Sequence, residues 1–400
     1  MIKQVFLYVL LFQFTSNAQG ILAISGQITD ADSEVFLTEV VIDIPYGGYA
    51  SSSNLEGQFI FQIPRLVMDS VVVTFSKIGY ESQSIEAVKL SEQSFNEIKL
   101  YKAKPIEIKL GLSDARTLVE AAVDSIKCNY ISASFFQNGF YQEGALIKEI
   151  GYVKIKESQL RVERYPEEKE VDRIKVLKSR YVNWSGQSDK IEAWQLGNGA
   201  AIASRSIETE LPDFLNKKSL RNYEFKVDSV MVSFHNLELY VVNFEPKSNG
   251  LRGGRFGKIY IEPESKAIVR IEYELTPKGL SDVIFGGTSG VKLKGESLKY
   301  VSQYRFSDDK WVLHQNTAWV SLNYKEKLDR QFSVDAIWYL TFLATETRKL
   351  EVRMIKETDV LGSTETFRRT NSLGNSFWDS QSFLAPTAEM QLITVNLRKR

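Results

Sequence analysis

Cysteine and histidine are scarce in this sequence. Its 400 residues include one cysteine, Cys128, and two histidines, His235 and His314. A single cysteine excludes a framework of internal disulfides and a structural zinc site built from several cysteines. Two histidines leave little room for histidine-based catalysis or metal binding. We therefore expect no cofactor, and we expect Cys128 to be a small buried residue.

An excess of charge of one sign is also missing. The chain carries 50 basic and 50 acidic residues, so its formal net charge is zero. A dedicated nucleic-acid-binding protein usually has a basic excess, and we expect no nucleic-acid partner. No stretch approaches about 18 consecutive apolar residues, which predicts that the chain has no transmembrane helix. The 43% hydrophobic and 12% aromatic content is typical of a folded, strand-rich protein.

The first 18 residues have the pattern of a signal peptide. Lys3 gives a positive start, residues 5–14 are mostly apolar, and Ser16-Asn17-Ala18 supplies small residues at the cleavage positions. Such a segment is too short to span a bilayer permanently, and the alternative is a buried N-terminal helix. No cysteine follows the apolar run, so we expect no lipid anchor. The mature, exported chain should start near Gln19.

Residues 21–110 are predicted to form short strands joined by turns. Ile24–Ile28 opens the first strand, and Val71–Val73 is typical of a fully buried strand. Clusters of turn-forming residues separate the strands, as at Asn54–Gly57. About seven strands at this spacing predict a β-sandwich of about ninety residues.

Five separated motifs in this region resemble a known domain family. In chain order they are Gly26-x-Ile28-x-Asp30, Val40-x-Ile42, Asn54-x-x-Gly57-x-Phe59, Val73-x-Phe75-x-x-Ile78-Gly79-Tyr80 and Ile98-x-Leu100. Together they are similar to the carboxypeptidase-regulatory-like domain, a transthyretin-like β-sandwich. The resemblance implies an envelope protein of Gram-negative bacteria, in the periplasm or associated with the outer membrane. It also implies a domain without catalytic residues.

Two glycines in these motifs are interpreted structurally. We expect Gly57 to adopt a positive φ in a hairpin turn. We expect Gly79 to let Tyr80 fold back onto the sandwich.

The clearest helix is predicted over residues 113–126, within a linker of residues 111–130. Its apolar residues fall on one face at helical spacing, and they are Ala115, Leu118, Val119, Ala122 and Ile126. Ser113 is the candidate N-cap. The segment is therefore predicted to be one linking helix between residues 21–110 and residues 131–400.

Residues 131–400 are predicted to form a larger antiparallel β-rich domain. Alternating apolar residues change phase across His235-Asn236, which is what a two-residue hairpin turn produces. Further hairpins are predicted around residues 263–266 and 307–310, and residues 332–342 form a long strand. Meanders of this kind form a curved sheet, a half-barrel or a closed barrel. The chain as a whole is therefore predicted to be mainly β.

Motifs in this second region carry a less specific resemblance. They are Gly139–Glu143, Phe214-Leu215 before Tyr223, Gly257–Glu262 with Ser265–Val269, Phe377-Trp378 and Pro386–Met390. They resemble the uncharacterised C-terminal part of exported proteins with a carboxypeptidase-like regulatory domain. The hairpin around Glu262 is similar to those of lipoprotein-carrier half-barrels, which hold acyl chains.

One set of residues has the spacing of a metal site. His235-Asn236-Leu237-Glu238 matches the His-x-x-Glu spacing of zinc carboxypeptidases, and His314 is the candidate third ligand. Zinc needs three ligands that converge at about 2 Å and one open position. The predicted hairpin instead favours a turn histidine and a solvent-facing glutamate. We therefore predict no catalytic, cofactor-binding or metal-binding residues.

Other charged and glycine-rich segments are interpreted as connections. Gly253–Gly257 and Gly286–Gly290 lack the strand and helix that flank a phosphate-binding loop. Glu167–Glu170 is predicted to be a solvated loop. Arg398–Arg400 could contact anionic lipid headgroups at the outer membrane, or could simply be a soluble chain end.

Three functions remain open from the sequence. The leading one is a non-enzymatic cell-envelope protein that binds a partner or ligand in the periplasm or at the outer membrane. Addition of a strand to a sandwich edge is one route to partner binding. The second is a carrier of a lipid or another apolar ligand, which needs a continuous apolar cavity larger than about 300 Å³ inside the half-barrel. The abundant Tyr and Phe residues would line that cavity or form a core. The third is a hydrolase, which requires His235, Glu238 and His314 to converge.

Overall fold

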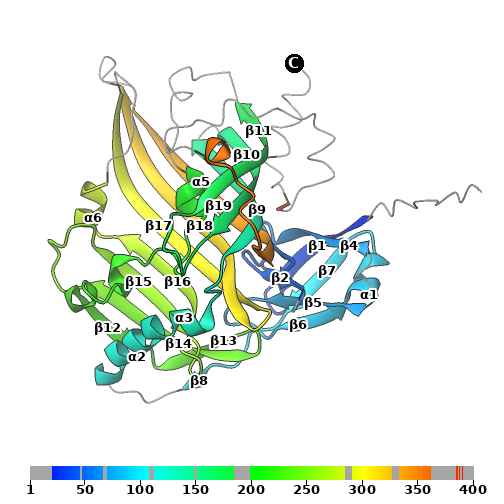
Figure 1. The fold of residues 1–400 in the computed structure, drawn as a ribbon, viewed down its shortest axis with the longest axis horizontal. Helices are drawn as coiled ribbons and strands as arrows, with labels where there is room; N and C mark the ends of the chain where they lie inside the picture. The colour runs from blue at the N-terminus through cyan, green and yellow to red at the C-terminus, as the bar shows by residue number, and fades with distance from the viewer. Residues whose placement is uncertain are drawn as a thin grey trace, which may run out of the picture.

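The computed structural model describes residues 20–45, 47–65, 70–107, 112–147, 151–183, 199–283, 291–326, 333–361, 384, 385, 387 and 390. Two small N-terminal sheets lie beside one large antiparallel sheet, and short helices pack around them (Figure 1). The prediction of a mainly β chain is confirmed.

Seven strands form the N-terminal part. The first sheet has the order β4-β1-β7 and consists of β1 (Ile21–Asp30), β4 (Gln58–Pro64) and β7 (Asn96–Leu100). The second has the order β3-β2-β5-β6 and consists of β2 (Val41–Asp43), β3 (Ala50–Ser52), β5 (Val72–Ser76) and β6 (Gln83–Glu86). Helix α1 (Ala87–Ser91) follows β6. Alternate residues of β4, namely Phe59, Phe61 and Ile63, are buried in a core that both sheets share.

The two glycines behave largely as predicted. Gly57 has a φ of +69°, but its turn joins β3 and β4 of different sheets, so the predicted hairpin is a crossover between the sheets. Gly79 has a φ of +83°, and the hydroxyl of Tyr80 donates to Asp30 Oδ2 at 2.9 Å. The prediction that Val71–Val73 is fully buried is wrong, because Val72 is exposed on the outer side of β5.

The predicted helix is present and packs into the large core. It comprises α2 (Leu112–Asp124) and the short α3 (Ile126–Asn129), so it begins one residue before the proposed cap Ser113. Strand β8 (Ile106–Glu107) precedes it and already pairs with the large sheet. The prediction that Cys128 is buried is wrong. Ile126 and Tyr130 are buried, and Cys128 lies two positions from each, about 200° around a helix, so it faces solvent.

In the part of the chain that the structure describes, the large sheet contains twelve strands. Its order is β11-β10-β9-β19-β18-β17-β16-β15-β14-β13-β8, and β12 also pairs with β14. The further strands are β9 (Phe135–Ile147), β10 (Gly151–Arg164), β11 (Arg173–Asn183), β12 (Tyr223–Val227), β13 (Val230–Phe234), β14 (Leu237–Pro246), β15 (Arg255–Ile261), β16 (Ile268–Leu275), β17 (Val291–Ser307), β18 (Lys310–Glu326) and β19 (Ser333–Lys349).

The three predicted hairpins are confirmed. His235 and Asn236 have φ values of 50° and 60° between β13 and β14, as a two-residue turn with positive φ at both positions requires. Asp308 and Asp309 have φ values of 50° and 62° between β17 and β18. Residues 263–266 join β15 to β16, and β19 is the predicted long strand.

The chain itself covers one face of the large sheet, which we call the inner face. Residues 199–222, here the plug segment, contain α5 (Gly199–Ala203), η2 (Asp213–Leu215) and η3 (Leu220–Asn222). Asn316 of β18 donates to the Ala203 carbonyl at 2.7 Å, and Phe214 stacks on Phe244 with ring centroids 4.2 Å apart. The plug segment, α2, α3 and the inner face share one hydrophobic core. The interior of the predicted half-barrel is therefore occupied by polypeptide.

The N-terminal sandwich packs against the opposite face, here the outer face, and against the β13–β14 turn. Tyr49 forms a backbone bridge with Glu346 of β19. The amide of Gly79 donates to the Ser233 carbonyl at 2.8 Å, and Arg305 Nη2 donates to the Gly48 carbonyl at 2.9 Å. We call this contact region the seam.

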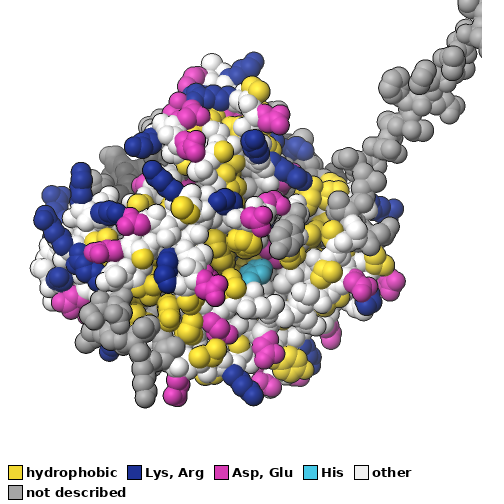
Figure 2. Space-filling view, turned by 60° about the horizontal axis from the view of Figure 1, so that its bottom comes forward, with side chains coloured by type: hydrophobic (Ala, Val, Ile, Leu, Met, Phe, Trp, Pro, Cys, Tyr) yellow, Lys and Arg dark blue, Asp and Glu magenta, His cyan; other side chains and the backbone are white. Residues whose placement is uncertain are grey.

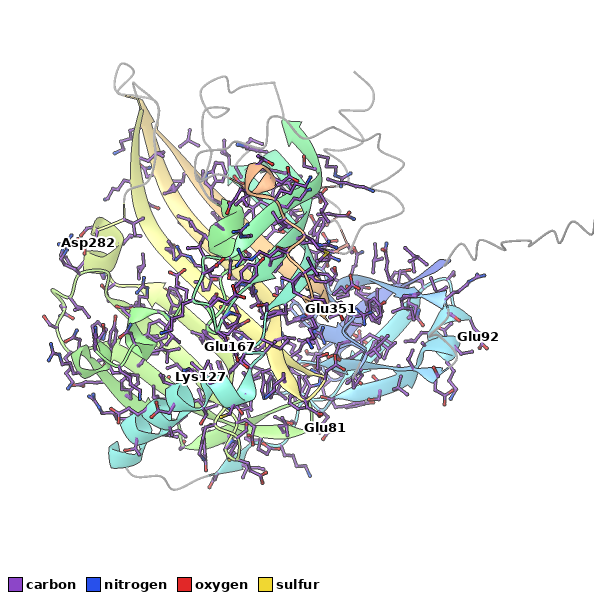
Figure 3. The ribbon with its side chains drawn as sticks, in the orientation of Figure 1. Glu81, Glu92, Lys127, Glu167, Asp282 and Glu351 are labelled. Carbon is purple, nitrogen blue, oxygen red and sulfur yellow. The ribbon has the colours of Figure 1, made fainter. Side chains whose placement is uncertain are left out.

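The remaining elements lie on the surface. Helix α6 (Pro277–Ser281) follows β16, and η4 (Glu357–Asp359) follows β19. The predicted solvated loop Glu167–Glu170 is exposed, and Figure 3 labels Glu167 within it. Within the described residues, no helix is long and apolar enough to cross a membrane.

Several predictions concern segments outside the described residues. These segments are the signal peptide of residues 1–18, Gly286–Gly290, Phe332, Phe377-Trp378 and Arg398–Arg400.

The packing of the plug segment predicts a large effect for Phe214→Ala. Phe214 is fully buried, so truncation should lower the free energy of unfolding by about 3–5 kcal/mol. Urea denaturation measures the change, and Phe95→Ala, a truncation of a half-exposed ring on the sandwich, is the control. A loss below about 1 kcal/mol for Phe214→Ala would contradict a packed inner face.

Candidate functional site

The three residues of the zinc hypothesis occupy different environments. His235 is in the β13–β14 turn, as predicted. Glu238 is half-buried on β14 with Oε2 shielded from solvent, so the prediction of a solvent-facing glutamate is wrong. His314 lies fully buried at a bulge in β18. Among the described residues, no group of three or more His, Cys, Asp or Glu side chains is placed to hold a metal ion.

Both histidines instead belong to a polar cluster at the seam, together with Asp43 and Arg305. His235 Nε2 lies 4.0 Å from Asp43 Oδ2. Within the part of the chain that the structure describes, several buried atoms of the cluster lack a hydrogen-bond partner: both oxygens of Asp43, His235 Nε2, Nε and Nη1 of Arg305, and both ring nitrogens of His314. Figure 2 shows a histidine in a hollow bordered by hydrophobic side chains. The side chain of His235 is 12% exposed, and His314 has no exposed surface.

Burial governs the protonation of this cluster. It lowers the pKa of His235, and it lowers the pKa of His314 well below the ordinary value, because a low-dielectric interior disfavours the imidazolium. The charge of Arg305 lowers both pKa values further. Burial also raises the pKa of Asp43, although His235 and Arg305 act against it. The cluster therefore favours uncharged imidazoles beside one guanidinium.

A larger opening lies on the outer face of the sheet, and we call it the groove. Its volume is about 520 Å³, within the range of small-molecule sites. Strands β12, β14, β15, β16 and β17 form it. The side chains on its outer-face side are the Phe256 ring, Asn243, glutamates and lysines, whereas Phe225, Phe244 and Tyr273 point to the inner-face core. Phe256 is 41% exposed there, although large aromatic residues are usually well buried.

Strand register arranges the groove side chains in two rows. Glu224 is opposite Glu245, and Phe256 is opposite Glu274. Phe244 is opposite Gly257, so Glu245 neighbours Phe256 across β14 and β15. We call Glu224, Glu245, Phe256 and Glu274 the acidic row, which ends at Lys299 opposite Glu274.

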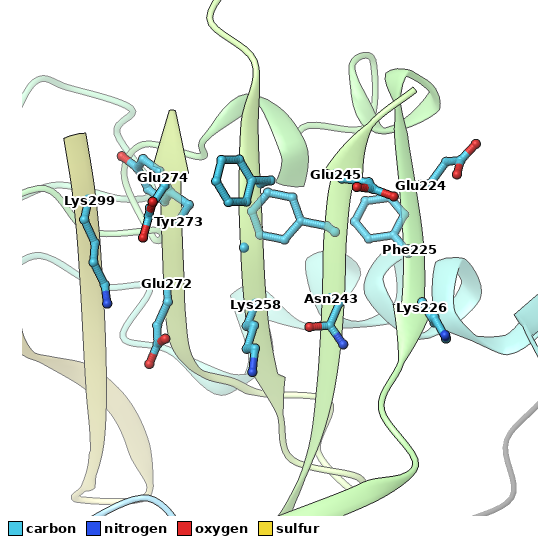
Figure 4. A pocket seen from close by; sticks show the side chains of 13 residues that line it. Glu224, Phe225, Lys226, Asn243, Glu245, Lys258, Glu272, Tyr273, Glu274 and Lys299 are labelled. Atoms are coloured by element: carbon cyan, nitrogen blue, oxygen red, sulfur yellow. The ribbon is translucent and has the colours of Figure 1, made fainter. Parts of the chain in front are cut away.

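The second row lies two residues away along each strand. Lys226 is opposite Asn243, and Asn243 is opposite Lys258. Lys258 is opposite Glu272. We call Lys226, Asn243 and Lys258 the lysine row. Figure 4 shows this row and Glu272 separate from the glutamates of the acidic row.

An ion-pair chain connects the groove to the seam. Arg270 Nε donates to Glu272 at 2.5 Å, and its Nη2 donates to Glu39 of the sandwich at 2.9 Å. Burial alone would raise the pKa of Glu39, but Arg270 outweighs burial and holds that pKa below its ordinary value. Glu272 is therefore occupied by Arg270, and the docked sandwich fixes the position of Arg270.

Two smaller pockets lie where the sandwich meets the sheet. One has a volume of about 220 Å³ and includes Tyr49 and Glu346 in its lining. The other has a volume of about 40 Å³, near Asn54 and Thr341, which is less than a small-molecule site needs. The groove is larger than either and is the candidate functional site.

The groove was not predicted from the sequence. Its signal is present as alternation of charged and apolar residues on short strands, for example Glu224-Phe225-Lys226 and Glu272-Tyr273-Glu274. Such alternation identifies a solvated face of a sheet, but it does not show which strands are neighbours. The rows come together because β12 pairs with β14. The strand between them in the chain, β13, forms its own hairpin with β14.

The environment of His314 predicts a pH dependence of stability. The pKa of His314 in the folded protein lies well below its ordinary value of 6.5, so the unfolded chain takes up the proton first. The free energy of unfolding should therefore fall as the pH drops below about 6.5. The raised pKa of Asp43 contributes with the opposite sign. A His314→Leu variant removes the histidine contribution and leaves no ring nitrogen without a partner.

When the pH is lowered from about 7.5 to about 5.5, the free energy of unfolding should fall less for the His314→Leu variant than for the wild type. Urea denaturation at each pH measures this fall. Equal losses in the two proteins would contradict the account of the cluster. A loss of several kcal/mol in the variant at neutral pH would also contradict it, since it would mean that the imidazole is bonded.

Comparisons with known proteins assign no family. No family model matches the sequence, and no curated protein matches it. The structure has a distant similarity to the crystal structure of a DUF1329 family protein from Desulfovibrio piger ATCC 29098. The TM-score is 0.26 at 8% sequence identity, over 62% of this chain and 99% of that chain. A similarity this low supports no conclusion about function.

Proposed function

We propose that this protein is a non-enzymatic binding protein of the cell envelope and that the groove is its ligand site. The observation that carries the proposal is the groove itself: about 520 Å³ on the outer face of a sheet, with a half-exposed phenylalanine ring between charges of both signs. Ligand sites characteristically combine apolar surface with a few placed polar groups.

The position of the groove on strands supports a binding role. Five hydrogen-bonded strands carry its side chains, and the plug segment supports the same sheet from the inner face. A rigid scaffold holds recognition groups in place and reduces the entropy lost on binding. The groove presents one exposed ring and charged side chains rather than a nucleophile hydrogen-bonded to a base, which is the arrangement that covalent catalysis needs.

The envelope location is supported by the sequence. The pattern of residues 1–18 favours export, and the five N-terminal motifs resemble the carboxypeptidase-regulatory-like domain of envelope proteins. We propose that the sandwich is such a domain and that the protein works in the periplasm or in peripheral contact with the outer membrane. In this proposal the sandwich stabilises the groove through the ion pairs of Arg270 with Glu39 and Glu272.

The carrier alternative receives no support from the packing of the inner face. It needs an apolar cavity inside the half-barrel, and the plug segment and α2 occupy that space. The groove lies on the other face and has a charged lining. We therefore do not adopt it.

The proposal predicts that Phe256 is needed to retain the natural ligand. Protein purified gently from its own envelope should carry a bound molecule in native mass spectrometry. Phe256→Ala should lose it, since removing a central ring weakens binding by about tenfold or more. Phe95→Ala, which truncates an exposed ring outside the groove, should retain it. Equal retention by Phe256→Ala and the wild type, or a wild type with nothing bound, would contradict the proposal.

A further inference from the structure

We infer that the groove recognises a zwitterion, with an ammonium group on the acidic row and an acid group on the lysine row. The inference rests on the proposed function and specifies the ligand class of that same groove. It follows from the placement of charge in the two rows.

The acidic row carries negative charge at the end formed by Glu224 and Glu245, where the row contains no basic side chain. Glu224 and Glu245 are directly opposite on neighbouring strands, and like charges so placed destabilise a sheet. Within the described residues, neither carboxylate forms an ion pair or a side-chain hydrogen bond. A bound cation would relieve this repulsion.

Phe256 selects an organic cation for this end of the groove. Its exposed ring lies between Glu245 on β14 and Glu274 on β16. An ammonium group near an aromatic face is attracted by the ring quadrupole, and flanking carboxylates add Coulomb attraction. A strongly hydrated metal ion would gain little from the ring.

The lysine row supplies the opposite charge. Lys226 and Lys258 flank Asn243, which can donate hydrogen bonds from its amide. Glu272 lies beside Lys258, but Arg270 already neutralises it. This row therefore presents net positive charge toward the groove.

The distance between the rows suits one small molecule. Residues two apart on a strand are separated by about 6.6 Å and point to the same face. A single zwitterion of a few bonds can therefore reach both rows, whereas a simple cation or anion can satisfy only one.

Phosphoethanolamine is the test probe, because it joins an ammonium group and a phosphate in one soluble molecule. Ethanolamine carries only the ammonium group, and inorganic phosphate carries only the anion. Isothermal titration calorimetry at low ionic strength, where charges are least screened, should show phosphoethanolamine binding more tightly than either fragment.

Substitutions in each row should have different effects. Glu245→Gln should weaken the binding of both phosphoethanolamine and ethanolamine by about two- to fivefold, and Phe256→Ala should weaken the binding of both by about tenfold. Lys258→Gln should remove the advantage of phosphoethanolamine and leave ethanolamine unchanged. Glu97→Gln and Lys104→Gln, on the exposed surface of the sandwich, are matched controls and should change nothing.

Vesicles separate the two sources of such a ligand. Binding to phosphatidylethanolamine vesicles, but not to phosphatidylglycerol vesicles, would assign the site to a lipid headgroup. Binding of free phosphoethanolamine alone would assign it to soluble zwitterions. The inference would be overturned if neither free phosphoethanolamine nor the phosphatidylethanolamine headgroup bound more tightly than the fragments. Binding that is unaffected by Glu245→Gln and Lys258→Gln would also overturn it. If the natural ligand still depends on Phe256 in that case, the proposed function stands and only the ligand class is wrong.

Discussion

The burial of the inner face of the large sheet is the constraint on which the rest of the structure depends. That face carries large aromatic residues, and exposing apolar surface to water costs about 25 cal/mol per Å². The chain buries this face under its own plug segment and α2, through contacts such as the stack of Phe214 on Phe244. This space is filled by polypeptide, and we propose that the ligand site lies on the outer face.

The sandwich and the groove both lie on the outer face. Arg270 marks the boundary, since it holds Glu39 of the sandwich on one side and Glu272 of the groove on the other. These ion pairs are partly buried, and they link the sandwich to the large sheet. The polar cluster of His235 and His314 lies farther along the same seam. There burial favours neutral imidazoles, which makes the seam sensitive to acid.

Local sequence patterns predicted the local structure and missed the contacts between distant segments. Two-residue turns such as His235-Asn236 leave a phase change in the hydrophobic pattern, and the helix at α2 leaves a 3.6-residue period, so both were predictable. The solvent exposure of Cys128 was not, because it depends on which side of a four-residue helix meets the core. The groove was not predictable either, since the pairing that places Glu224 beside Glu245 depends on a register set by the whole sheet.

The central claim is that the inner face is a packed core and that the outer groove is the ligand site. A crystal structure of the protein purified with its natural ligand tests both parts at once. The account predicts ligand density beside Phe256 on the outer face, with the plug segment in place across the inner face. Ligand density between the plug segment and the sheet, or a displaced plug segment, would contradict it.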